Sequence, residues 1–149
     1  MSKVLKIIGS IVIVYVVVFS CNKIISDKLE NDINNSPSIA NIGAKMEVKN
    51  VAEMMTKKLP QAIDTNTTVI KVEYIENENT IVFYYEVNHV TKEVVETKIS
   101  SLKTNQIEFI KTNPDNGVYI KAEVTFKYIY SNSKGEELGS YTILPSEYM

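Results

Sequence analysis

The chain of 149 residues contains no tryptophan and no arginine, and it has one cysteine and one histidine. Its 16 basic residues other than histidine are all lysines, which lack the planar guanidinium that binds guanine or phosphate in two hydrogen bonds at once. The formal net charge of −2 adds no attraction to a polyanion. We therefore expect no nucleic-acid partner. The single cysteine and histidine also disfavour a Cys/His metal cluster, a structural disulfide and Cys–His catalysis within one chain.

The remaining composition is that of a folded protein. Hydrophobic residues make up 44% of the chain and charged residues 23%, which excludes wholesale disorder and a polytopic membrane protein. The length predicts one domain with an appendage, not two independent cores.

The N-terminus has the pattern of a segment that enters a membrane. Lys3 and Lys6 precede an apolar run over residues 7–19, and the uncharged stretch 7–22 contains 16 residues. A bilayer-spanning helix needs about 17 to 25 residues, so the length favours a signal peptide. A retained anchor stays open, because Lys6 and Lys23 could extend their charged ends to the membrane surface. The N-terminal lysines favour the cytoplasmic side, which places the rest of the chain outside the cytoplasm.

Cys21 follows this apolar run directly, after the small residue Ser20. The sequence Val18-Phe19-Ser20-Cys21 resembles the lipobox of bacterial lipoproteins, and the resemblance implies that Cys21 is lipidated and becomes the mature N-terminus. The alternative is a cysteine that simply ends a transmembrane helix, since cysteine behaves as a small apolar residue. Either way, the membrane is a partner, reached through the N-terminal segment or through a lipid on Cys21.

The composition divides the rest of the chain into a tether and a domain. Residues 31–43 are rich in asparagine and serine and cannot bury a core, so we interpret residues 22–44 as a flexible tether and residues 45–149 as the extracytoplasmic domain.

Within the domain, apolar periodicity predicts two helices and two pairs of strands. The first helix is expected from Glu47 to about Leu59, before Pro60, and the second from a cap at Asn88 or Thr91 to the turn at residues 113–117. Strands are expected at residues 67–76, 80–87, 118–130 and 138–144. The order αββαββ predicts an α+β fold, a four-stranded and mainly antiparallel sheet with both helices on one face.

No group of residues predicts a catalytic or metal site. His89 lies at a strand-to-helix junction where a general base could be placed, but without a partner it is interpreted as a surface or capping residue. The acidic turn at residues 76–79 lacks the spacing of a calcium loop and is interpreted as a solvated hairpin turn. We expect no enzyme, no cofactor and no metal.

Tyrosines suggest a binding surface instead. Tyr84, Tyr119 and Tyr141 are expected on the sheet face that the helices leave open, beside Lys121, Glu123, Thr125 and Lys127. Exposed aromatic side chains there would anchor a protein partner, and Tyr119 and Tyr141 are the predicted anchors. The alternative is that these tyrosines only stabilise pairs across neighbouring strands. Partly by elimination, the sequence favours a small membrane-tethered interaction module: an envelope or secretion accessory lipoprotein of the pilot type, or an inhibitor or immunity protein. The alternative is a small-ligand-binding or enzymatic domain with a pocket between sheet and helices.

Overall fold

The computed structural model describes residues 37–149; Cys21 and the predicted signal or anchor segment lie outside them. Among these residues, no helix combines the length and the apolar character that crossing a bilayer requires. The elements, in chain order, are α3 (Pro37–Thr56), β1 (Gln61–Ala62), β2 (Thr67–Ile75), η2 (Glu76–Glu78), β3 (Thr80–Val87), α4 (Lys92–Thr112), η3 (Pro114–Asn116), α5 (Gly117–Lys121), β4 (Thr125–Ser131), β5 (Glu137–Ile143) and α6 (Pro145–Tyr148).

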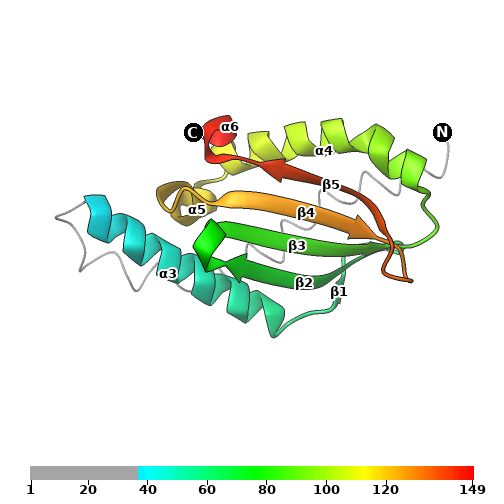
Figure 1. Cartoon of the computed structure of the whole chain (residues 1–149), viewed down its shortest axis with the longest axis horizontal. Coiled ribbons are helices and arrows are strands. Elements are labelled where there is room, and N and C mark those ends of the chain that lie inside the picture. Colours follow the sequence, from blue (N-terminus) through cyan, green and yellow to red (C-terminus); the bar gives the residue numbers. More distant parts are fainter. Residues whose placement is uncertain (1–36) are drawn as a thin grey trace.

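The strands form one sheet in the order β1-β2-β3-β4-β5, which confirms the predicted α+β class (Figure 1). The predicted number of four strands is wrong, because the two-residue strand β1 pairs with β2 as a fifth. All neighbouring strands are antiparallel except β3 and β4. That pair is parallel because α4 carries the chain back along the sheet, as a crossover connection must.

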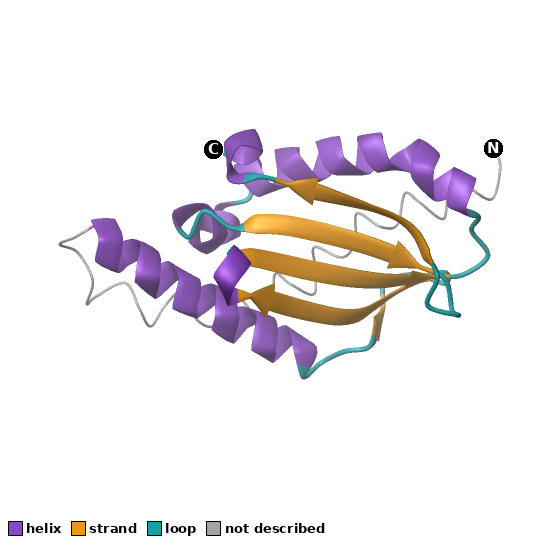
Figure 2. Ribbon diagram, viewed as in Figure 1, coloured by secondary structure: helices purple, strands orange, loops and turns teal. Residues whose placement is uncertain are grey.

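The helices lie along the two margins of the sheet. Helix α3 runs beside β2 and α4 beside β5, with the short α5 between them at one end (Figure 2). Side chains of all three helices join one buried cluster with alternate residues of the strands. The cluster includes Val51 of α3, Leu102 of α4 and Tyr119 of α5. One face of the sheet therefore forms the core, and the other face is left open.

Helix α4 packs directly against the backbone of β5 at Gly139. A Cβ atom at this position would lie 2.8 Å from Cδ1 of Ile99 and 3.0 Å from Cγ1 of Val95. The absence of a side chain at residue 139 thus sets how closely α4 packs on β5.

Helix α3 begins ten residues before the predicted start at Glu47. Asn41 Nδ2 donates a hydrogen bond of 3.0 Å to the carbonyl oxygen of Lys121, and Ala44 is 7% exposed. Residues 37–43, which the composition assigned to the tether, are therefore helical, and Asn41 among them contacts the domain. The division of the chain into anchor, tether and domain otherwise stays a prediction.

The strand predicted over residues 118–130 is wrong in its first half. Residues 117–121 form α5, and Glu123 at φ 52° turns the chain before β4 begins at Thr125. Tyr119 and Ala122 are buried, three residues apart, which is the spacing of a helix face. Pro114 opens the helical turn η3 immediately before α5, and a proline at this position favours a helix start.

The short C-terminal helix α6 adds Tyr148 to the buried cluster. Tyr148 donates a hydrogen bond of 2.6 Å to the carbonyl oxygen of Val124. Glu147 accepts a hydrogen bond from the backbone N–H of Leu144 and forms an ion pair of 2.8 Å with Lys103 of α4. The hydrogen bond from Leu144 and the contact with Lys103 hold the pKa of Glu147 below its usual range.

Candidate functional site

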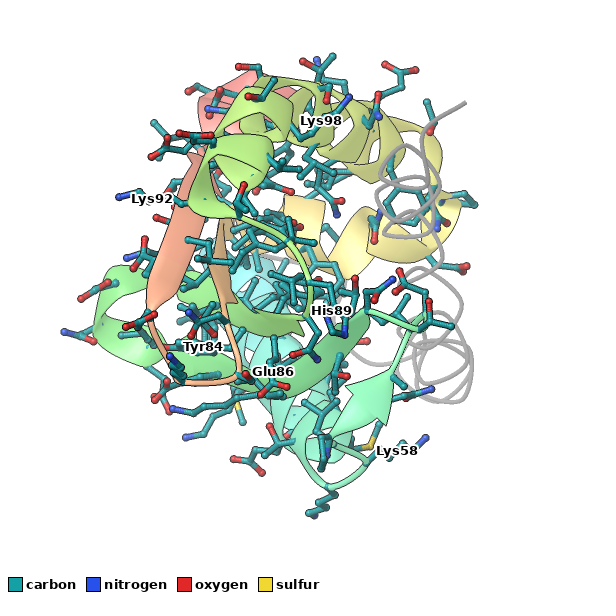
Figure 3. The ribbon with its side chains drawn as sticks, turned by 90° about the vertical axis from the view of Figure 1, so that its right-hand side faces the viewer. Lys58, Tyr84, Glu86, His89, Lys92 and Lys98 are labelled. Carbon is teal, nitrogen blue, oxygen red and sulfur yellow. The ribbon has the colours of Figure 1, made fainter. Side chains whose placement is uncertain are left out.

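The open face is the surface of the sheet opposite the three helices, and strand pairing arranges its side chains in rows. One row runs Lys71, Tyr84, Ile129 and Ser140, and the next runs Glu73, Val82, Lys127 and Thr142. These residues alternate with the buried residues of the core, so their side chains point away from the helices. Figure 3 places Tyr84 and Glu86 on the side of the sheet away from Lys98 of α4.

Tyr84 is held by two neighbours on β2. Its hydroxyl donates a hydrogen bond of 3.3 Å to Oε2 of Glu73, and Nζ of Lys71 lies 5.1 Å from the centre of its ring. Lys71 also binds Oε2 of Glu73 at 2.6 Å. This triad fixes the tyrosine ring over the sheet before any partner binds, which lowers the entropy cost of using it as an anchor.

The triad also sets the protonation of its members. The hydrogen bond from Lys71 holds the pKa of Glu73 below its usual range, and the same bond raises the pKa of Lys71. Burial, and next the Glu73 carboxylate, raise the pKa of Tyr84. At neutral pH the triad therefore consists of an ammonium, a carboxylate and a neutral phenol.

The open face has an apolar centre and a charged rim. Val82 is only 2% exposed although no helix covers it, and Tyr84 and Ile129 beside it are half-buried. Lys71, Glu73, Lys127 and Glu86 surround this centre. An aromatic and aliphatic centre within a polar rim is the usual anatomy of a protein interface. Chemically, this face can bind another protein.

The structure does not place Tyr119 and Tyr141 on this face, so their predicted exposure is wrong. Tyr119 belongs to α5, is 2% exposed, and packs edge-on against Phe126 at 5.5 Å between ring centres. Tyr141 is 8% exposed and stacks on Tyr128 at 4.8 Å. Lys121 and Glu123 lie before β4 begins at Thr125, so they are not part of the open face either. Of the residues expected here from the strand predicted over residues 118–130, Thr125 and Lys127 do belong to the open face.

Tyr84 is the tyrosine of the expected group that does lie on the open face. Its signal in the sequence is the alternation of residues 80–87, where Ile81, Phe83 and Tyr85 share the apolar phase and Tyr84 falls in the other. Sequence phase alone could identify it, because β3 contains no bulge in its pairing with β4.

The space between sheet and helices is filled by aromatic rings. Tyr85 stacks on Tyr130 at 5.1 Å, and Phe83 stacks on Tyr128 at 5.2 Å between ring centres. Tyr130 and Tyr141 are hydrogen-bonded through their phenols, and burial raises the pKa of Tyr130 to about 12. Tyr130 and Tyr141 stay protonated at neutral pH, and all of these aromatic residues belong to the buried core.

The other candidate groups lie apart from the open face. His89 is exposed in the loop between β3 and α4, at φ 59°. The acidic turn forms η2, where Lys49 of α3 binds Glu76. Within residues 37–149 no three His, Cys, Asp or Glu side chains are grouped so that they could hold a metal ion. Cys21, the predicted lipidation site, lies outside the described residues.

Together these features define a class of α+β domain with a mixed five-stranded sheet, helices over one face and an open face opposite. The chain belongs to the family described as a domain of unknown function, DUF8479, which matches residues 43–139. No curated protein matches the sequence.

Two solved structures have a similar fold. A Pseudomonas aeruginosa protein described as secreted aligns with a TM-score of 0.61 at 11% identity, over 78% of this chain and 100% of its own. The pilotin EpsS of the Vibrio vulnificus type 2 secretion system aligns with a TM-score of 0.53 at 9% identity, over 75% of this chain and 97% of its own. At these identities the similarity shows the fold alone.

Proposed function

We propose that this protein is a membrane-tethered, extracytoplasmic module that binds another protein through the open face of its sheet, as an accessory of secretion or of the cell envelope. The observation that carries the proposal is the open face itself, where Tyr84 is fixed at the centre of an apolar patch with a charged rim. The proposed role is non-catalytic.

Two further observations support the location and the role. The apolar run before Cys21, with lysines only at its start, is typical of exported proteins. The fold is shared with a protein described as secreted, which supports the location, and with a pilotin of a type 2 secretion system, which supports the accessory role.

Photo-crosslinking from single positions tests the proposal. The photoreactive amino acid p-benzoylphenylalanine is placed at Tyr84 or Ile129 on the open face, or as a control at Thr97, which is exposed on α4. Cells that produce the protein natively are irradiated, and the adducts are identified by mass spectrometry. We expect the same protein adduct from both open-face positions and none from the control. An adduct from Thr97 with none from the open face would contradict the proposal.

A further inference from the structure

Large apolar side chains are exposed at one end of the described part of the chain. Within residues 37–149, five large apolar residues are exposed, and four of them belong to the first half of α3 or flank α6. Helix α3 contacts α5, and α6 lies at the same end of the molecule, where α3 begins (Figure 1). The four residues and their exposures are Ile42 at 60%, Met46 at 63%, Leu144 at 50% and Met149 at 64%.

On α3 the exposed apolar residues have lysines on the same face. Ile42, Lys45, Met46 and Lys49 follow the spacing i, i+3, i+4, i+7, which aligns them along one side of a helix. Ile42 and Met46 point away from the buried side of α3, which carries Val48 and Val51. Lys49 forms an ion pair with Glu76 of η2, and Lys45 lies between Ile42 and Met46 on the same face. Apolar residues beside a lysine that can extend toward water are the pattern of a helix lying in a membrane interface.

The position of this face in the chain indicates what covers it. Only 14 residues, 23–36, separate the apolar run 7–22 from the start of α3. A chain of that length spans at most about 50 Å, even fully extended. Along the chain, the start of α3 is therefore the described point nearest to the membrane segment, and the exposed residues lie at that point.

We propose that this end of the domain rests on the membrane surface, with Ile42 and Met46 inserted at the boundary between headgroups and acyl chains. The inference rests on the proposed membrane tether. The strands run lengthwise from this end of the molecule (Figure 1). Contact at this end therefore leaves the open face of the sheet accessible to a partner.

The absence of tryptophan in the chain makes a direct test possible. Full-length chains with Ile42→Trp, Met46→Trp or, as a control on the open face, Tyr84→Trp each carry one tryptophan. Each is reconstituted into phosphatidylcholine vesicles with and without bromine on the acyl chains, and vesicle flotation is recorded for each sample. Bromine quenches only a tryptophan that reaches the acyl region.

We expect quenching and a shift to shorter emission wavelength for the two α3 variants, and neither for the Tyr84→Trp variant. If all chains float but none is quenched, or all are quenched equally, the orientation is overturned while the tether stands. If the chains do not float, the tether and the orientation both fail. If the tryptophan emission of the α3 variants shifts with the protein-to-lipid ratio but bromine does not quench it, a second copy of the chain covers Ile42 and Met46. That result also overturns the proposal.

Discussion

Replacing Tyr141 by alanine tests which face of the sheet is the core. Tyr141 is 8% exposed and stacks on Tyr128 at 4.8 Å, with Tyr130 as its second ring contact at 6.2 Å. Truncation of a buried aromatic residue leaves a cavity and costs about 3 to 5 kcal/mol of unfolding free energy. The milder Tyr141→Phe removes only the phenol that hydrogen-bonds to Tyr130, and we expect a cost of about 1 kcal/mol.

The matched control is Tyr84→Ala on the open face. Tyr84 is half-buried and contacts Lys71 and Glu73 at the surface, so its loss is expected to cost about 1 kcal/mol or less. Urea unfolding of residues 37–149, followed by far-ultraviolet circular dichroism, measures all three variants. A cost for Tyr141→Ala no larger than that for Tyr84→Ala would refute the assignment of the two faces.

Three further results are expected. Gly139→Ala places a methyl 2.8 Å from Ile99 and should destabilise the domain by about 1 to 3 kcal/mol in urea unfolding, whereas Gly117→Ala meets no atom within 4 Å and should not. A chain starting at Lys45 should unfold about 2 kcal/mol more easily than one starting at Pro37, because it loses the Asn41 hydrogen bond and part of α3; equal stability would contradict the structural role of residues 37–44. Because the pKa of Glu147 is lowered by folding, its stabilisation is present above its ordinary pKa and is lost as the pH falls through the lowered value. Glu147→Gln should thus be less stable than wild type at pH 7, the gap should close in acid, and a gap independent of pH would contradict the role of the carboxylate.

Periodicity in the sequence predicts the central elements because their side chains meet two different environments. The hairpin of β2 and β3 and the long helix α4 were expected at nearly their observed bounds, since buried apolar residues recur at every second position in the strands and along one side of α4. The same reasoning gives the wrong prediction for residues 118–124. Val118, Ile120, Ala122 and Val124 alternate like a strand, but the turn at η3 starts a helix before them.

Other features could not be predicted because their cause is tertiary. Residues 37–43 include proline, serine, asparagine and glycine, which favour a loop in the sequence, and their helix is supported by contacts such as that of Asn41 with Lys121. Strand β1 has two residues and no pattern of its own. A register shift opposite Tyr130 and Ser131 changes which residues of β5 face the core. Tyr141 faces the core as a result. The open-face position of Lys127 was correctly expected, since β4 keeps a regular alternation.

The affinity of the crosslinked partner for open-face variants tests the central claim most directly. Isothermal titration calorimetry would compare wild type with Tyr84→Ala, Ile129→Ala and, as a control on α4, Thr97→Ala, each at matched fold stability. An anchor residue contributes about 2 kcal/mol or more, so Tyr84→Ala should weaken binding roughly 30-fold or more. Ile129→Ala should weaken it in the same direction, and Thr97→Ala should leave it unchanged. Affinities equal to wild type for both open-face variants would contradict the claim that this face binds the partner.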